Sequence, residues 1–448
     1  RSTTSIMRRL STNLLSLSFL LTGCATLPAT IDRTAAVPEL RTAIWGIEVQ
    51  DDSGRVLYER NAHTLLMPAS NRKLFAASSA LNCFGLDRRF DTELWLDGAN
   101  VVVRGGGDPS LGGRWAFDRD AVFGTFVDAL RSRNVQAVDD VVADASLFDR
   151  NTIPGSWKAG NLGADYAAPV DALAYNENVV GVVVDDCEHP LVTTDPPFVP
   201  ATAHVICGTG EPSIRADANN ALTIEGTMPP HFRALVSIAD PALYAAQAFR
   251  DALRHAGIEV RGAMRVNTVP RTWPERIAVI QSPPLSLLLA TMLKVSQNLY
   301  AEMLFKGTAG TYMGAEDLER LFLKSEAGID GAEFRFVDGS GLAPDDLVTP
   351  AAAVTLLRWM NAPSRRGVFW SLLATPGEEG TLRRRLVPLS SRLRGKTGTI
   401  AGVNALSGIL AGAHGGFRYF SIVINHHIAE TSTATRAIDA IVNAIAGF

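Results

Sequence analysis

Three short polar motifs in this 448-residue sequence carry side chains suited to covalent catalysis, and the first is Ser70-Asn71-Arg72-Lys73. It follows Pro68 at the start of a predicted helix, where a spacing of three residues places Ser70 and Lys73 on one face. A serine hydroxyl is a poor nucleophile until a neighbouring base takes its proton, and a lysine can be that base when burial or nearby positive charge lowers its pKa. Alone, the motif also fits a serine helix cap beside a solvated lysine, so its meaning depends on the other two motifs.

The second motif is Ser296-Gln297-Asn298, which lies between helical segments predicted over 284–295 and 299–306. In extended backbone, a spacing of two residues points Ser296 and Asn298 toward the same side. The hydroxyl could then relay a proton, and the amide could hold a substrate carbonyl. An ordinary polar junction between two helices would look the same, so this motif is less specific than the first.

The third motif is Lys396-Thr397-Gly398-Thr399, within a predicted strand on which Lys396 and Gly398 face one side. A glycine lets a substrate backbone lie close to the strand. A cation among hydroxyl groups suits a terminal carboxylate. The motif therefore predicts a strand that binds a ligand ending in a carboxylate.

The elements that must position these motifs come from both ends of the chain. Apolar, β-prone runs at 43–50 and 55–59 flank Asp51-Asp52-Ser53-Gly54, which predicts a hairpin. Helical spacing of apolar residues predicts a helix from Ser70 to Leu81. Further strands are expected at 94–96, 101–103, 140–143, 179–184, 222–226, 391–400, 403–412 and 417–425, and further helices at 119–132, 241–255, 284–306, 350–361 and 432–446. This pattern predicts an α+β fold whose main sheet is assembled from both termini.

The composition is that of an ordinary globular chain, with 47% hydrophobic and 20% charged residues. With 42 basic and 46 acidic residues and only 7% aromatic residues, neither nucleic acid nor an anionic membrane surface is expected as a partner. The eight histidines include no His-Glu-x-x-His spacing, and the sequence has no Cys-x-x-Cys pair. We therefore expect neither a metal site nor a cofactor.

The N-terminal residues have the pattern of an export signal. Arg8 and Arg9 precede the apolar run 10–21, which is too short to span a bilayer and ends in Leu21-Thr22-Gly23-Cys24. This ending resembles a bacterial lipoprotein box, which implies that 1–23 are removed as a signal peptide and that Cys24 carries lipid. Ala25, in place of aspartate, resembles the outer-membrane sorting pattern. We expect export to the bacterial periplasm, a tether over 24–40 and membrane contact only through the lipid, with an ordinary secretory signal or a buried helix as the alternative.

The remaining cysteines fit an exported protein, in which disulfides persist. Cys187 and Cys207 flank a stretch rich in proline and threonine and could close a loop. Cys83 lies at the end of a predicted helix, where we expect a buried apolar residue. Sequence alone does not fix the pairing, so the Cys187–Cys207 disulfide is a hypothesis.

Taken in order, Ser-x-x-Lys, Ser-x-Asn and Lys-Thr-Gly resemble the signature of penicillin-binding proteins and serine β-lactamases. The long gap between the first two motifs resembles the class C low-molecular-mass penicillin-binding proteins, the D-alanyl-D-alanine carboxypeptidase/endopeptidase family of penicillin-binding protein 4 type. Segments similar to that family also occur at 105–111, 141–149, 166–180, 337–342, 380–386 and 395–408. The resemblance covers roughly 41–448, nearly all of the chain after the signal.

The resemblance implies roles for the first two motifs. Ser70 would attack the carbonyl of a D-Ala-D-X bond in a peptidoglycan stem peptide and become acylated, with Lys73 as general base. Ser296 would pass the proton to the leaving amine, and Asn298 would hold the amide on the acyl side. The segment Asp338-Gly339-Ser340-Gly341 is interpreted as a turn near the cleft, with at most an indirect role.

The resemblance also implies that the third motif binds substrate. Lys396 would supply positive potential beside Ser296 and the substrate carboxylate. Thr397 and Thr399 would donate through their hydroxyls, and Gly398 would leave room for the substrate. The backbone N–H groups of Ser70 and Thr399 would form the oxyanion hole, and β-lactam antibiotics would acylate the same serine and leave slowly.

The implied fold is a transpeptidase-like α+β domain with a large two-domain insert. Its expected parts are a catalytic domain at 41–84 and 283–448, an insert domain at 85–92 and 166–282, and an inner insert domain at 93–165. A serine β-lactamase or esterase remains an alternative that would turn penicillin over quickly, although the large insert argues against it. A non-catalytic envelope scaffold is a second alternative, which would not need the serine and lysine of the first motif.

Overall fold

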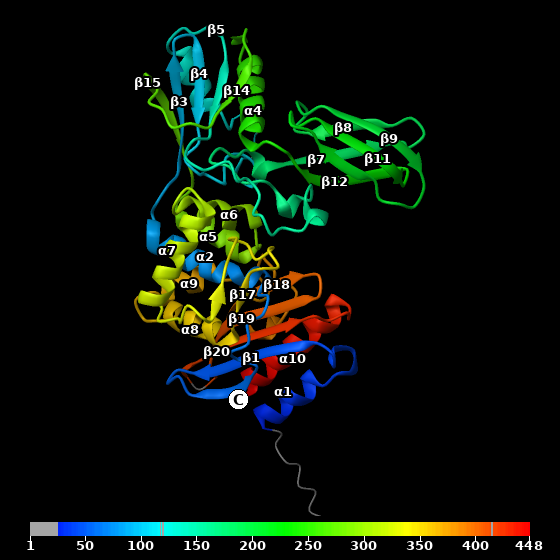
Figure 1. Ribbon diagram of the computed structural model, residues 1–448, viewed down its shortest axis with the longest axis vertical. Coiled ribbons are helices and arrows are strands. Elements are labelled where there is room, and N and C mark those ends of the chain that lie inside the picture. Colours follow the sequence, from blue (N-terminus) through cyan, green and yellow to red (C-terminus); the bar gives the residue numbers. More distant parts are fainter. Residues whose placement is uncertain (1–25, 117, 119–120, 414) are drawn as a thin grey trace, which may run out of the picture.

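The computed structural model describes residues 26–116, 118, 121–413 and 415–448 (Figure 1). The signal at 1–23 and the lipidation motif ending in Cys24 lie outside these residues. Within the described ranges, no helix combines the length and the apolar character that a bilayer crossing requires.

The main sheet has five antiparallel strands in the order β18-β19-β20-β1-β2. It joins the two ends of the chain, because β1 pairs with β20 in a register that sets Trp45 opposite Ile424. The strands are β1 (Ile44–Asp51), β2 (Val56–Arg60), β18 (Leu393–Ile400), β19 (Val403–Ala411) and β20 (Phe417–Asn425). The expected α+β class and the sheet built from both termini are confirmed.

Helices cover both faces of this sheet. On one face, α10 (Thr431–Gly447) and α1 (Leu27–Ala35) share an apolar core with the strands (Figure 1). On the other face lies a helical layer with its own core, built from α2 (Arg72–Phe84), α5 (Leu285–Lys294), α6 (Asn298–Gly307), α7 (Tyr312–Ser325), α8 (Pro350–Met360) and α9 (Arg366–Leu372). A short ladder of β16 (Phe334–Arg335) and β17 (Leu347–Val348) lies beside this layer.

Two expectations about the N-terminal half are wrong. Residues 24–40 are not simply a tether, since Leu27, Ile31 and Ala35 recur every four residues on α1 and are buried against α10. This spacing gives the short helix an apolar face that must be covered. Cys83 is exposed rather than buried, because it lies in the last turn of α2, beyond the buried stretch that ends at Ala80.

The insert contains a second five-stranded sheet in the order β14-β6-β4-β3-β15. Its strands are β3 (Asp91–Asp97), β4 (Asn100–Arg104), β6 (Val141–Asp144), β14 (Met264–Asn267) and β15 (Glu275–Gln281), with α3 (Gly124–Arg131), α4 (Pro241–His255) and the short pair β5 (Ala137–Val138) and β13 (Glu259–Val260). The α3 and α4 side chains share an apolar core with this sheet.

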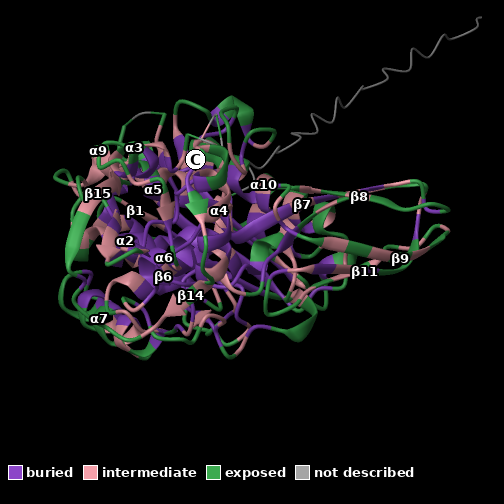
Figure 2. Cartoon of the chain, turned by 90° about the horizontal axis from the view of Figure 1, so that it is seen from above, coloured by how far each residue is buried: buried purple, intermediate pink, exposed green. Residues whose placement is uncertain are grey.

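A third part projects to one side of the molecule and carries mostly half-buried and exposed strand residues (Figure 2). It consists of two three-stranded sheets, one of β7 (Val179–Asp185), β8 (Leu191–Asp195) and β12 (His231–Ser237), and one of β9 (Ala201–Cys207), β10 (Ser213–Ala216) and β11 (Leu222–Met228). A disulfide joins Cys187 to Cys207.

The expected nesting of the insert is wrong. Strands β3, β4 and β6, assigned to an inner domain at 93–165, share one sheet with β14 and β15, assigned to the domain at 166–282. The nested part is instead the projecting pair of sheets, 179–237. The error has a physical cause, because β6 pairs with β14 by setting Val141 beside Met264, and no local pattern in either strand encodes so distant a partner.

Between β6 and β7 the chain returns to the helical layer through residues 145–178, which we call the strap. The strap has little regular structure beyond short 3₁₀ turns. One apolar cluster packs its Phe148 and Val170 against Leu299 and Met303 of α6. A second packs its Trp157 near Leu342. The strap therefore brings residues of the insert to the end of α6 where the second motif lies.

Candidate active site

Ser70 lies in a tight 3₁₀ turn, Ala69–Asn71, immediately before α2. Two glycines allow other segments to approach this turn closely. A Cβ on Gly398 would lie 2.7 Å from the Pro68 carbonyl oxygen and 3.1 Å from the Ser70 nitrogen. A Cβ on Gly341, whose φ is +83°, would lie 1.9 Å from the Ala69 carbonyl oxygen. Strand β18 and the loop at 338–341 therefore enclose the serine from two sides.

Lys73 is fully buried, and its ammonium nitrogen has three oxygen neighbours. Nζ lies 2.8 Å from Ser70 Oγ, 2.6 Å from Asn298 Oδ1 and 2.8 Å from the Ser340 carbonyl oxygen. Burial lowers the pKa of Lys73 to about 7, although nearby carboxyl groups oppose the shift. At neutral pH a large share of this lysine is therefore unprotonated and able to accept the serine proton.

Lys396 stands on the other side of the site and is also fully buried. Its Nζ donates to Ser296 Oγ at 2.8 Å and to the Thr397 carbonyl at 2.8 Å. Burial, and then the charge of Lys73, lower the pKa of Lys396 well below its usual value. Each of the two lysines thus contacts one serine of the predicted motifs.

The backbone of the second motif differs from the expected extended form. Ser296 has φ +66°, in the left-handed region, and Asn298 is the first residue of α6. The chain must reverse between the end of α5 and the start of α6, and Ser296 makes that reversal. Both side chains still reach the site, because Ser296 meets Lys396 and Asn298 meets Lys73.

The hydroxyls of the third motif are placed differently from each other. Thr399 is exposed and lines a cavity of about 320 Å³ beside Ser70, and its Oγ1 accepts a long hydrogen bond from Asn404 at 3.4 Å. Thr397 is buried, and its carbonyl holds Lys396. The same cavity is lined by Lys158, Asn161 and Tyr166 of the strap and by Asn298, Gly341, Leu342, Pro344, Ile400 and Ala401.

Sequence reasoning missed Glu302, a buried carboxyl group behind Lys73. Its two oxygens accept from the backbone N–H groups of Gly339 at 2.9 Å and Ser340 at 2.8 Å. It thereby orients the peptide that ends in the carbonyl bound to Lys73. Burial, and then the charge of Asp338, raise the pKa of Glu302 to about 8. The signal was available, because a helix beginning at Asn298 places residue 302 on the same face.

A second pair of buried carboxyl groups holds the loop that the sequence presented as a simple turn. Asp338 accepts from Trp157 Nε1 at 2.9 Å, from Gly341 N–H at 2.7 Å and from Ala343 N–H at 2.8 Å. Burial alone would raise its pKa, but hydrogen bonds from Asp346 and these neighbours keep the pKa of Asp338 below its usual value. Burial and the Asp338 charge raise the pKa of Asp346 well above its own usual value. We infer that Asp346 stays protonated beside an ionised Asp338.

Arg72, the residue before the lysine of the first motif, anchors the same loop from below. Its guanidinium makes two hydrogen bonds of 2.8 Å to the buried carboxylate of Glu319, and its Nε donates to the Asp338 carbonyl at 2.8 Å. The plane lies over the rings of Phe305 and Phe336, at 4.7 and 4.1 Å from their centres. This buried network fixes the first turn of α2 relative to the loop at 338–341.

The strap closes one rim of the site through polar contacts with the second motif. Asn298 Nδ2 donates to the Tyr166 carbonyl at 2.7 Å, and Gln297 Nε2 donates to Glu177 at 2.6 Å. Lys306 of α6 pairs with Asp149 at 2.7 Å. Among the described residues, no cluster of three or more His, Cys, Asp or Glu side chains is arranged to hold a metal ion. The arrangement can activate a serine, relay a proton and bind an extended peptide.

Comparison with known proteins agrees with this geometry. A family model described as D-Ala-D-Ala carboxypeptidase 3 (S13) family matches residues 27–445. The chain is 31% identical to a D-alanyl-D-alanine carboxypeptidase of Actinomadura sp. strain R39, over 91% of this chain and 82% of that protein. It is 26% identical to D-alanyl-D-alanine carboxypeptidase DacB of Haemophilus influenzae, over 92% and 91%. The crystal structure of penicillin binding protein 4 from Haemophilus influenzae superposes with a TM-score of 0.83 at 21% identity, covering 93% of this chain and 99% of that one.

Proposed function

This chain belongs to the D-Ala-D-Ala carboxypeptidase 3 (S13) family, and we propose that it is a serine D,D-peptidase that cleaves peptidoglycan stem peptides through an acyl-enzyme on Ser70. The observation that carries the proposal is the 2.8 Å contact between Ser70 Oγ and Lys73 Nζ. The family is named for carboxypeptidases that act on D-Ala-D-Ala, which identifies the bond that this serine would attack. A serine beside a lysine with a pKa of about 7 is an activated nucleophile.

In the acylation step, unprotonated Lys73 takes the proton from Ser70 as Oγ attacks the carbonyl of the penultimate D-alanine. The amide C–N bond breaks, and the leaving amine takes a proton relayed through Ser296, which Lys396 contacts. Water then hydrolyses the Ser70 ester and restores the enzyme. Asn298 and the exposed Thr399 flank the cavity in which the acyl part lies.

Lys396 has a separate role in this scheme, as the binding group for the substrate carboxylate. Its burial makes the charged form costly, and an anionic carboxylate beside it would favour that form. Substrate binding and the positive charge beside Ser296 are thereby coupled. Removal of a terminal D-alanine and cleavage of a cross-link both use this chemistry, because they break the same kind of bond.

A β-lactam contains a strained amide that Ser70 would attack in the same way. The amine released by ring opening stays attached to the acyl group, so it continues to occupy the position that water needs. We therefore propose that the chain binds penicillin covalently and releases it slowly. A serine β-lactamase would instead release it within the assay.

The decisive experiment is mass spectrometry of the purified protein after a few minutes with benzylpenicillin. We expect an adduct on the peptide containing Ser70 in the wild type and none in Ser70→Ala. The exposed-serine variant Ser371→Ala serves as the matched control and should label like the wild type. Rapid penicillin hydrolysis without an adduct would favour the β-lactamase alternative. The absence of both an adduct and hydrolysis would favour a non-catalytic scaffold.

We further propose that the protein is exported to the bacterial periplasm and is anchored through lipid on Cys24, in the outer rather than the inner membrane. The signal and lipoprotein-box residues support this, and the Cys187–Cys207 disulfide fits an oxidising compartment. When a lysate of bacteria that express the protein is separated into detergent and aqueous phases, the wild type should enter the detergent phase and the Cys24→Ser variant should stay in the aqueous phase. Equal partitioning of both would contradict the anchor.

A further inference from the structure

Glu177, near the end of the strap, accepts hydrogen bonds from three separate parts of the chain. Its Oε1 accepts from Arg114 Nε and from Tyr300 Oη at 3.4 Å, and its Oε2 accepts from Arg114 Nη2 at 3.0 Å and from Gln297 Nε2 at 2.6 Å. Arg114 belongs to the insert, Gln297 to the second motif and Tyr300 to α6. Only 12% of the Glu177 side chain is exposed. The carboxylate therefore joins the insert to the loop between α5 and α6.

The backbone that carries Glu177 is in an unfavourable conformation. Asn176, Glu177 and Asn178 have φ of +50°, +55° and +56°, so three consecutive residues other than glycine lie in the left-handed region. Asparagine tolerates this region, whereas glutamate does not share that tolerance. The two asparagines hold the turn, because Asn176 Nδ2 donates to the Val179 carbonyl at 2.9 Å and Asn178 Nδ2 to the Pro169 carbonyl at 2.9 Å. Strain of this kind persists only where surrounding contacts maintain it, and here those contacts aim the Glu177 carboxylate at the loop between α5 and α6.

The Glu177 carboxylate fixes the orientation of the Gln297 side-chain amide. An ionised carboxylate only accepts hydrogen bonds, so the nitrogen of the Gln297 amide must face Glu177 and its oxygen must face away. That oxygen accepts from the Leu299 N–H at 2.9 Å and caps the first turn of α6. Gln297 thus connects Glu177 to the start of α6, with Ser296 immediately before it in the chain and Asn298 immediately after it.

Ser296 depends on this connection more than Asn298 does. The Asn298 side chain is held on both sides, by Lys73 Nζ at 2.6 Å and by a strap carbonyl at 2.7 Å. Ser296 has a left-handed φ of +66°, and within the described part of the chain it makes a single hydrogen bond, from Lys396 Nζ to its Oγ. Loss of the Glu177 contact should therefore displace Ser296 first.

From these contacts we propose that Glu177 is a positioning residue for the departure of the leaving group, because through Gln297 it holds Ser296 where the hydroxyl can pass a proton to the amine. This inference rests on the proposed serine D,D-peptidase function. In the step concerned, the Ser70 hydroxyl gives up one proton as its oxygen forms the ester, and the departing nitrogen gains one through Ser296 as the C–N bond breaks. The insert thereby contributes to the geometry of the reaction, although Glu177 does not touch the reacting atoms.

The test compares two substrates that share one D-alanyl acyl part and differ in the leaving group. One is a peptide amide, whose nitrogen must gain a proton to leave, and the other is a thioester, whose thiolate leaves without one. For Glu177→Ala we expect kcat/KM for the amide to fall by about 30-fold, mainly through kcat, and kcat/KM for the thioester to stay within about threefold of the wild type. A general structural effect would slow both substrates alike, because both must acylate Ser70 with the help of Lys73.

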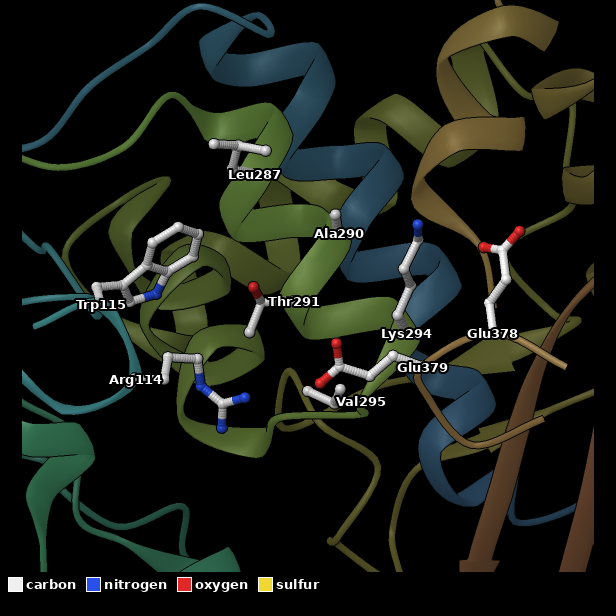
Figure 3. Close-up of a pocket in the computed structure, with 9 residues that line it drawn as sticks. All are labelled: Arg114, Trp115, Leu287, Ala290, Thr291, Lys294, Val295, Glu378 and Glu379. Carbon is white, nitrogen blue, oxygen red and sulfur yellow. The ribbon is translucent and has the colours of Figure 1, made fainter. Parts of the chain in front are cut away.

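A matched control and an exchange of the two side chains separate this role from charge or folding effects. Figure 3 shows Glu379 and Arg114 among the residues that line a pocket of about 390 Å³ beside α5. Glu379 is exposed and, among the described residues, makes no hydrogen bond with the second motif, so Glu379→Gln should change neither rate. Gln297→Glu sets two carboxylates against each other and should slow the amide about as strongly as Glu177→Ala.

The double variant Glu177→Gln with Gln297→Glu restores a donor and an acceptor with their roles exchanged. The new amide at position 177 can donate to the new carboxylate at position 297, which can still accept from the start of α6. We expect the amide rate to recover at least fivefold from that of Gln297→Glu alone. Glu177→Gln by itself keeps the shape of the side chain but loses one of its two polar contacts, and should slow the amide by about five- to tenfold with the thioester rate unchanged.

Three results would overturn the inference while leaving the proposed function intact. These are equal losses on the amide and the thioester, amide rates in both Glu177 variants that stay within about twofold of the wild type, and a double variant that shows no recovery. A wild type that is acylated by neither substrate and forms no penicillin adduct on Ser70 would instead refute the proposed function, and the inference with it.

Discussion

The acylation of Ser70 should rise with pH as Lys73 loses its proton, because the unprotonated amine is the form that acts as base. With a pKa of about 7, the active fraction is about one tenth at pH 6, one half at pH 7 and nine tenths at pH 8. The acylation rate should therefore increase by about tenfold from pH 6 to pH 8. A lysine with the ordinary pKa of 10.5 would instead give about a hundredfold increase over the same range.

The assay is the second-order rate of labelling by a fluorescent penicillin, followed by gel fluorescence at intervals between pH 6 and pH 8. Lys73→Arg is the control, since a guanidinium keeps its proton, and we expect its rate to fall by about 10²- to 10⁴-fold and to lose the pH dependence. A hundredfold rise in the wild type would show that burial does not lower the pKa of Lys73. A flat profile, or an arginine variant that retains the rate, would show that Lys73 is not the base.

A substitution of Glu302 gives a second test of the pH dependence of Ser70 acylation. Ionised Glu302 raises the pKa of Lys73, but the Glu302 pKa of about 8 leaves most of this charge absent at pH 7, so Glu302→Gln should move the midpoint of the acylation profile to lower pH by only a small amount. The amide has only one oxygen to accept from the backbone, where the carboxylate accepts from both Gly339 and Ser340. We therefore also expect a lower plateau, by about tenfold, from a less well held Ser340 carbonyl. An unchanged midpoint with a lower plateau would leave Glu302 with a structural role only.

Three further predictions concern stability. In Gly341→Ala the new Cβ would lie 1.9 Å from a backbone oxygen, so this variant should lose at least about 3 kcal/mol of unfolding free energy and should no longer label. Gly377→Ala is the control, because it has the same φ of +83° but its nearest neighbour would lie at 3.7 Å, and it should lose about 1 kcal/mol. Urea unfolding, with penicillin labelling measured in parallel, distinguishes the two variants. Cys207→Ser removes a cross-link over 20 residues and should destabilise the projecting sheets by about 3 kcal/mol, seen as faster hydrogen exchange there, with labelling of the active serine unchanged. Arg72→Lys keeps the charge but loses the paired hydrogen bonds to Glu319, and should lower the free energy of unfolding by about 3 kcal/mol, while an unchanged value would show that the buried pair contributes little.

Features encoded by local pattern were predictable from the sequence. The three C-terminal strands expected at 391–400, 403–412 and 417–425 are found at Leu393–Ile400, Val403–Ala411 and Phe417–Asn425. The helix expected at 241–255 has those bounds. Alternating or helical spacing of apolar residues reports which face of an element is buried, and glycine or asparagine reports where it ends. These signals need no knowledge of the partner element.

The parts that failed depend on partners far away in the chain. The nesting of the insert follows from the pairing of β6 with β14, and either strand alone would fit many neighbours. The roles of Glu302, Asp338 and Asp346 follow from burial behind Lys73, which the sequence does not express, because acidic residues are usually solvated. The left-handed turn at Ser296 likewise follows from the directions in which α5 and α6 pack.

The arrangement of charges explains how a lysine among three buried carboxyl groups can still serve as a base. A carboxylate in direct contact would hold Lys73 in its protonated form. In this site the three groups that touch Nζ are a hydroxyl, an amide oxygen and a backbone carbonyl, all uncharged. The carboxyl groups of Glu302 and Asp338 do not contact Nζ and instead accept hydrogen bonds from backbone N–H groups of the neighbouring loop. The effect of burial on the pKa of Lys73 is therefore larger than the opposing attraction of the carboxyl groups for its positive charge. The carboxyl groups position the loop while the pKa of Lys73 stays low.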